Sequence, residues 1–329
     1  MSKQQSLLIK GIAILMMLMA HLYNIHEDFS LYLYIGNKPL MQYLYNISIS
    51  CVAIYTILSG YGCSYNDNKL TIKYKLIKLL KLYTTFWLVL FIFPICIGSF
   101  MRPDKYPGNY LEFIQNIIGY RWTYNLHYWF LLPYSIIFLF SNHIIAFVNR
   151  TKKLFAVLFF GVLYLVASYI LSRYRSGFFR IQYIYIAIHI FNLLFAFVIG
   201  VLMERLNREK KLIKENIFGL YAIIFLILIS VCRSLIHTSA LNVLYATIAV
   251  YLIIHIRFNR YIEITLVKLG KYSMPIWFIH GYFTVFLFHD YLCMLKYPLL
   301  MYIALICVSY LISLMIMRIS NSIFKILNI

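Results

Sequence analysis

The sequence has little negative charge: 10 of its 329 residues are Asp or Glu, against 30 Lys and Arg. No acidic residue falls deep within an apolar run, whereas ion-coupled carriers often depend on carboxylates inside the membrane. The positive charge would favour a nucleic-acid partner in a soluble protein, but 63% of these residues are hydrophobic and only 12% are charged. A core of this size cannot hide so much apolar surface, so we expect an integral membrane protein with no nucleic-acid partner.

The chain also lacks paired cysteines, long polar segments and internal repeats. Its 6 cysteines stand singly, with no C-x-x-C pair and no histidine at ligand spacing, so they read as small core residues and predict no metal site. The longest polar connection, 101–124, is only about two dozen residues long. We therefore expect a single membrane domain over residues 1–329. The first apolar run is long enough to span and ends without a small-x-small cleavage site, so we expect it to stay attached.

Apolar runs of about 17 to 25 residues predict a polytopic, all-α membrane helix bundle with about ten transmembrane helices. Basic residues concentrate in alternate connections, which indicates that both termini and the 65–78 loop are cytoplasmic and that the 101–124 loop is outside. The predicted helices lie at roughly 7–27, 43–64, 79–100, 126–148, 153–172, 183–203, 214–232, 239–257, 272–290 and 297–318.

The first predicted helix carries two ionisable residues in its apolar run, Lys10 and His21. At about 100° and 1.5 Å per residue, the helix returns both side chains to nearly the same face, roughly 16 Å apart along the axis. Ionisable groups at membrane depth usually face a cavity or the bundle interior, so the pair indicates a site. The alternative is that Lys10 snorkels to the interface and that His21 is a neutral contact between helices.

Three lysines around the start of the third predicted helix, Lys75, Lys78 and Lys81, are spaced three residues apart and fall on neighbouring helical positions. They are consistent with ordinary positive-inside charge. The functional alternative is a patch that binds the phosphates of a polyphosphate cofactor at the cytoplasmic mouth of the bundle.

Three further helices carry candidate site residues. The second predicted helix ends in Ser59-Gly60-Tyr61-Gly62, where small residues permit close approach of another backbone. The fourth begins with Trp129 at the outer side, where aromatic residues commonly form the interfacial belt. The ninth places His280 at a depth comparable to that of His21, which favours one cavity lined by both imidazoles.

These stretches together resemble the acyltransferase-3 family of integral membrane O-acyltransferases, which modify sugars of bacterial surface polysaccharides. The resemblance spans nearly the whole chain. Lys10-x10-His21 is similar to the family's first-helix pattern of a basic residue, ten positions and a histidine, with Lys where Arg is common. Ser59-Gly60-Tyr61 is similar to its S-G-[YF] element.

The remaining motifs depart further from the family. The segment from Lys78 through Lys81 to Phe86 resembles R-x-x-R-[IL]-x-P-x-Y, with lysines for both arginines, Thr84 for the proline and Phe86 for the tyrosine. A lysine is a weaker bidentate phosphate ligand than an arginine, so donor affinity is the property that these departures affect. The segments Leu126–Leu131 and Gly270–His280 resemble the W-F-L and G-x-x-S…H elements.

The resemblance implies that an acyl group, usually acetyl, passes from a cytoplasmic acyl-CoA to a hydroxyl of a cell-surface or lipid-linked saccharide, with no metal, in the bacterial cytoplasmic membrane. It implies that His21 and Lys10 are the catalytic residues, with His21 as the general base or a transient nucleophile. The other implied roles are to bind the phosphates of the CoA and to support the site: Lys10, Lys78 and Lys81 for the phosphates, and Ser59, Tyr61, Trp129 and His280 for support.

Which group would orient His21 is left open by the sequence. The nearest acidic residue on its face is Asp28, about 10 Å further along the helix axis. His280, Ser59 or a backbone carbonyl are the alternatives.

Two other functions fit the helix pattern. A transporter or flippase for a polysaccharide precursor would explain the buried histidines without any reaction. A non-catalytic subunit of an envelope polysaccharide system predicts indifference to substitution of His21. The identity of the saccharide and the length of the acyl group are not encoded in any motif that the sequence displays.

Overall fold

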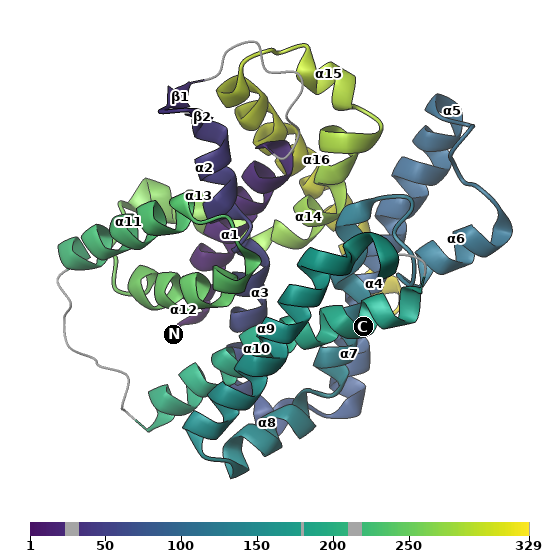
Figure 1. Ribbon diagram of the computed structural model, residues 1–329. Coiled ribbons are helices and arrows are strands. Elements are labelled where there is room, and N and C mark those ends of the chain that lie inside the picture. Colours follow the sequence, from purple (N-terminus) through teal and green to yellow (C-terminus); the bar gives the residue numbers. More distant parts are fainter. Residues whose placement is uncertain (24–32, 179–180, 210–218, 329) are drawn as a thin grey trace.

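The computed structural model describes residues 1–23, 33–178, 181–209 and 219–328 of the chain (Figure 1). Within these residues the protein is all-α apart from one short antiparallel hairpin, β1 (Tyr34–Ile35) and β2 (Lys38–Pro39). The predicted class, an all-α membrane helix bundle, is confirmed.

Six helical segments of the described chain are long and apolar enough to cross a membrane. Their sequences are rich in Leu and Ile, whose high hydrophobicity suits a helix that crosses a membrane. They are α1 (Lys3–Tyr23); α2 (Leu40–Ser48) with α3 (Cys51–Tyr65); α4 (Ile72–Leu90) with the π-helix η2 (Phe91–Gly98) and α5 (Ser99–Met101); α9 (Lys153–Phe178); α10 (Gln182–Arg208); and α16 (Pro298–Ile326).

Other apolar runs form broken or shorter helices. The run that predicted one helix over 126–148 bends by 60° beside Phe140, and counts at most as a seventh span. The pieces are η3 (Leu126–Phe130), α7 (Leu131–Leu139) and α8 (Ser141–Arg150); α11 (Gly219–Leu235); η4 (Ser239–Leu241) and α12 (Asn242–Ile253); and α14 (Ser273–Gly281), the π-helix η5 (Tyr282–Phe286) and α15 (His289–Cys293). Ten spans are therefore not supported, because an apolar run does not reveal where its helix bends.

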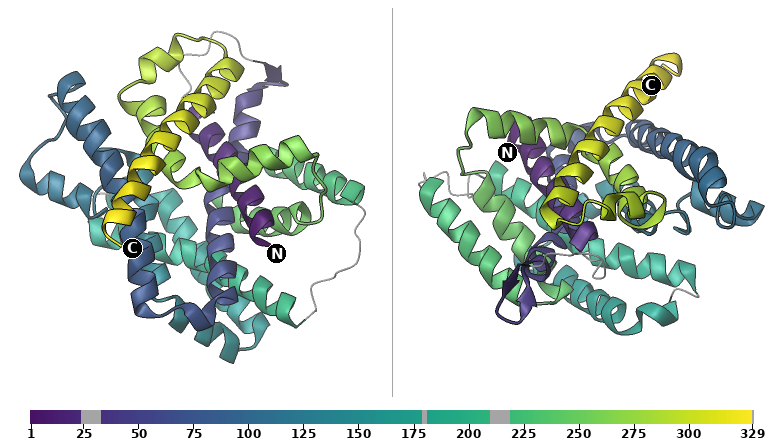
Figure 2. Two further views of the ribbon diagram at one scale, coloured as in Figure 1. Left: turned by 180° about the vertical axis from the view of Figure 1, so that it is seen from behind. Right: turned by 90° about the horizontal axis from the view of Figure 1, so that it is seen from above.

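The remaining elements lie between these segments: η1 (Asp67–Lys69), α6 (Tyr110–Ile117) and α13 (Arg260–Lys271). Figure 2 shows the region of α5 and α6 and the end of α16 projecting from the main body of the bundle.

Glycines let two helices cross in close contact. A Cβ at Gly60 of α3 would collide with the backbone carbonyl of Phe197 in α10, and one at Gly200 of α10 would collide with that of Ile57 in α3. The crossing confirms the close approach predicted from the Ser59–Gly62 segment, but only Gly60 makes it. Gly62 has nothing within 4 Å of its Cβ position.

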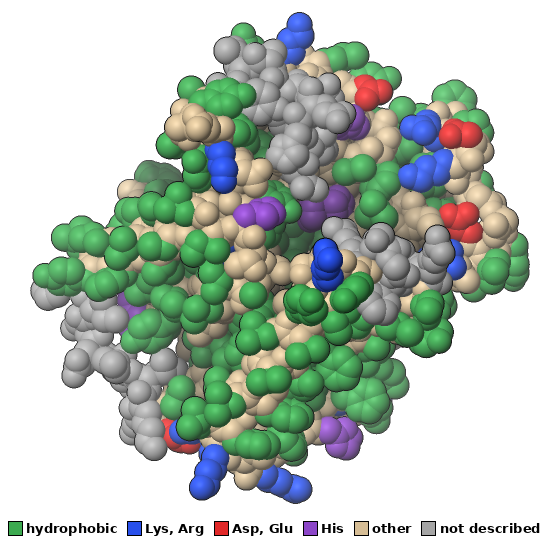
Figure 3. Space-filling model, in the orientation of Figure 1, with side chains coloured by type: hydrophobic (Ala, Val, Ile, Leu, Met, Phe, Trp, Pro, Cys, Tyr) green, Lys and Arg blue, Asp and Glu red, His purple; other side chains and the backbone are tan. Residues whose placement is uncertain are grey.

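The outer surface is strongly apolar. Hydrophobic side chains cover much of the face drawn in Figure 3. Along α9, for example, Leu158, Val162 and Tyr169 are more than half exposed. A soluble protein rarely exposes so large a continuous apolar surface, whereas a bilayer requires one. The described chain is a multi-pass membrane protein.

Candidate active site

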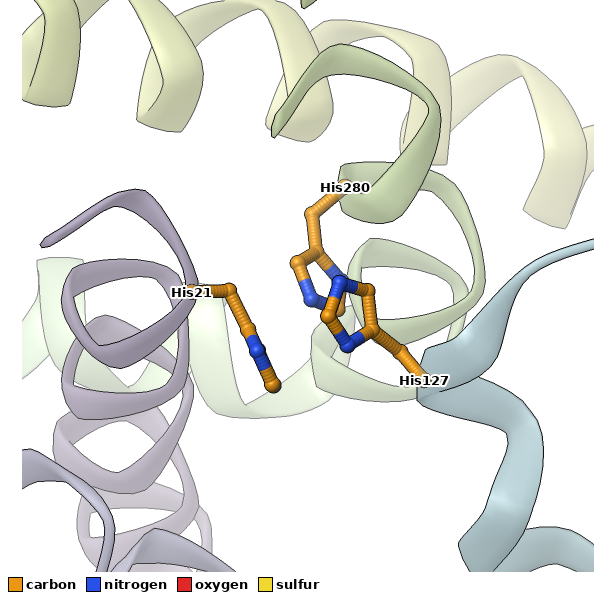
Figure 4. A group of neighbouring side chains, drawn as sticks. All are labelled: His21, His127 and His280. Carbon is orange, nitrogen blue, oxygen red and sulfur yellow. The ribbon is translucent and has the colours of Figure 1, made fainter. Parts of the chain in front are cut away.

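Three imidazole rings from distant parts of the sequence meet inside the bundle (Figure 4). The ring centres of His21 and His127 are 3.7 Å apart, and each lies 4.9 Å from the centre of His280. Figure 4 shows the three side chains extending toward one another from α1, η3 and α14. We call His21, His127 and His280 the histidine cluster.

His127 was not predicted as a site residue, and it enters the cluster on the 3-10 helix η3. The Asn125 side chain caps this helix by accepting a hydrogen bond from the backbone N–H of His127, at 3.0 Å. The Trp277 indole then donates to the His127 carbonyl, at 3.1 Å, and ties η3 to α14. The sequence signal for His127 is its place in the Leu126–Leu131 segment, which resembles the W-F-L element of the family.

Gly281 allows η3 to lie directly against α14. A Cβ at Gly281 would come within 2.5 Å of the Asn125 side chain and within 2.6 Å of the His127 ring. Beside it, the Tyr128 hydroxyl donates to the Phe278 carbonyl at 2.8 Å. The position of His127 therefore depends on this glycine and on hydrogen bonds to backbone atoms.

His280 is fully buried, and its Nδ1 lies 2.7 Å from the Trp277 carbonyl oxygen. A carbonyl can only accept, so Nδ1 carries the hydrogen and the Nε2 of the neutral ring is left as an acceptor. Among the described residues, that Nε2 and the Nε2 of His127 are buried without a hydrogen-bond partner. Two unsatisfied ring nitrogens therefore belong to one cluster.

A cavity of about 510 Å³ extends from the histidine cluster along α1. Both Lys10 and His21 line it, so the predicted shared face of the first helix is confirmed. By helical rise these two residues are roughly 16 Å apart. The cavity is therefore a slot with a lysine near one end and imidazoles near the other. His127 lines it as well, whereas His280 lies behind the other two rings.

The three lysines singled out on α4, Lys75, Lys78 and Lys81, lie in three different places. Lys78 lines the cavity together with Lys10. Lys75 is buried, and its ammonium group donates to the Leu139 carbonyl at 2.6 Å and to Asn142 at 2.5 Å, which ties α4 to α7 and α8. Lys81 does not line the cavity, and its ammonium group lies 5.4 Å from the centre of the Phe324 ring on α16.

The residues predicted to support the site do not all lie in the cavity. Ser59 and Trp129 line the cavity, and the Ser59 hydroxyl donates to the Tyr134 hydroxyl at 3.3 Å rather than to His21. Trp129 faces this interior slot rather than an interfacial belt, and its ring centre lies 4.4 Å from that of His189, with the two planes tilted by 32°. Tyr61 points elsewhere, since its hydroxyl accepts from the amino group of Met1 at 2.8 Å.

No carboxylate lines the cavity among the residues that the structure describes. The ion pairs found in this part of the chain join Arg102 to Asp104, Lys153 and Arg205 to Glu209, and Arg208 to Glu204, and they leave Lys10 and Lys78 out. Asp28 lies outside the described residues. The lysines of the cavity are therefore available for an anionic ligand.

The histidine cluster also needs to be tested as a metal site, because one nitrogen of each ring lies within 4.8 Å of the others. Zinc binds imidazole nitrogen at about 2.0–2.1 Å in tetrahedral geometry, which holds the ring centres about 5 Å apart. The two distances to His280, at 4.9 Å, match that spacing, whereas the 3.7 Å between His21 and His127 is too short for it. The packing fits direct contact between rings better than it fits three ligands around an ion.

The fold and the cavity together define a multi-pass membrane protein with an interior slot that is lined by lysines and by two imidazoles. A family model described as an acyltransferase domain, of the acyltransferase-3 type, matches residues 8–318. The chain belongs to this family and is an acyltransferase, which confirms the resemblance seen in its motifs. No curated protein and no solved structure matches the chain.

Proposed function

We propose that this protein transfers an acyl group, most simply acetyl, from cytoplasmic acyl-CoA to a hydroxyl of a cell-surface or lipid-linked saccharide, in the bacterial cytoplasmic membrane. The observation that carries the proposal is the slot that joins Lys10 and Lys78 to His21. A ligand in this slot would meet anion-binding lysines at one end and a general base at the other.

The donor would enter from the lysine end. Two ammonium groups without carboxylate partners in the described chain suit the phosphates of CoA, since charge-assisted hydrogen bonds to phosphate are strong. The cytoplasmic termini predicted from the basic residues would open this end to the cytoplasm, where acyl-CoA is found. The pantetheine arm would then lie along α1 and bring the thioester to His21.

The histidine end would perform the transfer. His21 removes the proton of the acceptor hydroxyl, and the oxygen attacks the thioester carbonyl carbon. The carbon–sulfur bond breaks, and the proton passes from His21 to the departing CoA thiolate. The balanced products are an ester and free CoA. The second route, in which His21 carries the acyl group before the hydroxyl attacks, uses the same atoms.

The walls of the slot support this chemistry by excluding water. Trp129, Phe130 and Tyr134 line it, and the rings of Phe130 and Tyr134 stack with centres 5.2 Å apart. An apolar wall protects a thioester from hydrolysis and strengthens the polar interactions inside. Ser59 fixes the Tyr134 hydroxyl on the same wall.

Mass spectrometry of surface glycans from cells with and without the protein tests the proposal. We expect the glycans to keep their sugar composition and to lose ester-linked acyl groups when the protein is absent. A transporter or flippase would instead lower the amount of the glycan itself. That result, or unchanged acylation, would contradict the proposed function.

A further inference from the structure

The histidine cluster holds one imidazole more than the sequence predicted and no carboxylate from the described residues. A base that takes a proton in a water-poor site becomes a buried cation, and a buried charge is costly unless a hydrogen bond compensates it. Enzymes often supply this bond from a carboxylate behind the histidine. The geometry shows another acceptor in that place.

We propose that His127 and His280 form a hydrogen-bond relay with His21, in which the Nε2 of His280 accepts a hydrogen bond from the imidazolium created during acyl transfer. The relay rests on the proposed function and adds two residues to it. His127 contacts the cavity and is a catalytic residue in this scheme. His280 acts through the other two rings and is a positioning residue.

The backbone of α14 determines which nitrogen of the His280 ring donates a hydrogen bond and which one accepts. The Trp277 carbonyl accepts from Nδ1 of His280 at 2.7 Å and so keeps Nε2 as a lone pair. That Nε2 is fully buried and has no partner in the described chain. The ring of His280 lies as near to His21 as to His127, at 4.9 Å. The ring that carries this acceptor is therefore equally close to His21 and to His127.

His127 connects the relay to the slot. Its ring contacts that of His21 at 3.7 Å and lies over that of His280 with an interplanar angle of 22°. Catalytic hydrogen bonds are often long before substrate binds and shorten in the reactive complex. The hydroxyl proton goes to His21, is shared within the cluster while the tetrahedral intermediate forms, and leaves with the CoA thiolate. No oxidant, metal or further reactant is needed.

Two substitutions of His280 separate this role from a structural one. His280→Asn keeps an N–H near the position of Nδ1, and thus a donor to the Trp277 carbonyl, but removes the distal acceptor. His280→Gln places an amide oxygen near the position of Nε2 and loses the donor to Trp277. If the relay is correct, His280→Gln is more active than His280→Asn. If His280 only holds the structure through its bond to Trp277, His280→Asn is more active than His280→Gln.

The assay uses inverted membrane vesicles from cells in which the protein acylates a surface glycan, with radiolabelled acetyl-CoA as the probe. We expect His280→Asn and His127→Asn to lower kcat roughly 10- to 100-fold, as expected for loss of a hydrogen bond to a charged group. The KM for acetyl-CoA should stay close to the parent's in His280→Asn, because His280 does not line the slot. Immunoblots of the membrane fraction normalise each rate.

His255→Asn is the matched control. Its Nε2 is also buried without a partner in the described chain, but His255 lies outside the histidine cluster and the slot. We expect its kcat to equal the parent's. A kcat in His280→Asn equal to that of the control, or equal losses in His280→Asn and His280→Gln, would overturn the relay.

His21→Gln in the same vesicles separates the two proposals. If it is inactive while His127→Asn and His280→Asn work at the parental rate, the relay fails and the proposed function stands. If His21→Gln itself works at the parental rate, His21 is not the base, and the relay built on it fails as well, whereas absence of acyl transfer by the parent protein would contradict the proposed function.

Discussion

The ring of His127 packs 3.7 Å from that of His21, so a short 3-10 helix brings a second imidazole to the one that the first helix presents. Both rings line the same cavity. The contact joins two segments that share no sequence pattern. It also makes the position of η3 as important to the site as the position of α1.

Gly281 is the residue that lets η3 reach this position. We expect Gly281→Ala to lower kcat, because the new Cβ would meet the Asn125 side chain and the His127 ring. The measurement is the acylation rate in membrane vesicles, normalised to the amount of protein.

The matched control is Gly161→Ala on α9, where the nearest atom to the new Cβ is a ring carbon of Phe195 at an ordinary 3.6 Å. Alanine is the better helix former by up to about 1 kcal/mol, so this variant should keep its rate and its thermal stability. A Gly281→Ala variant as active as Gly161→Ala would contradict the account of η3.

The cavity distinguishes two lysines that the sequence treats alike. We expect Lys78→Ala to weaken acyl-CoA binding by about 10- to 100-fold, as expected for loss of a charge-assisted hydrogen bond. Lys81→Ala should bind nearly as well as the parent, because Lys81 lies against Phe324 rather than in the cavity. Lys78→Arg should retain or improve binding, since a guanidinium keeps the charge and adds a phosphate-matching fork.

Calorimetric titration of purified protein with acetyl-CoA measures these affinities. Equal weakening by Lys78→Ala and Lys81→Ala would show that general positive charge, rather than the cavity, attracts the donor. If the variant that carries both Lys78→Ala and Lys81→Ala binds acetyl-CoA as well as the parent, neither lysine binds the donor. Their positive charge then serves only to orient the protein in the membrane.

Helix geometry explains what the sequence predicted well. The spacing of Lys10 and His21 sets a shared face because both lie on one continuous helix, and the structure places both in the cavity. His127 could not be paired with them, because its contact depends on a cap, a glycine and hydrogen bonds contributed by another helix. The bend beside Phe140 is a different case, because the apolar α7 is followed there by the more polar α8, which begins Ser141-Asn142-His143, and this change of composition was a signal that the prediction of one helix over 126–148 did not use.

The absence of a metal from the reaction stays a prediction. The rings of His21 and His127 are closer than zinc ligands would be, so we expect acylation to survive dialysis against EDTA. Elemental analysis of the purified protein should find no stoichiometric transition metal. Loss of activity on chelation, with recovery on adding Zn²⁺, would turn the histidine cluster into a metal site.

The direction of donor entry depends on topology. Tyr110 is exposed at the start of α6, and we expect Tyr110→Cys to react with a membrane-impermeant maleimide in intact cells. Lys73→Cys, near the start of α4, should react only after the membrane is opened. Both variants require a background in which the 6 natural cysteines are replaced by serine. The reverse pattern would place the lysine end of the cavity outside and exclude cytoplasmic acyl-CoA as the donor.

Substitution of His21 tests the central claim most directly. Removing a positioned general base typically lowers a rate by about 10² to 10⁴, and removing an obligatory nucleophile can lower it further. The measurement is the ester-linked acyl content of surface glycans in cells that carry His21→Ala or His21→Gln, normalised to protein in the membrane fraction. We predict no detectable acylation with near-normal insertion of both variants. Full acylation by His21→Ala would contradict the account, and His21 would then be only a neutral contact between helices.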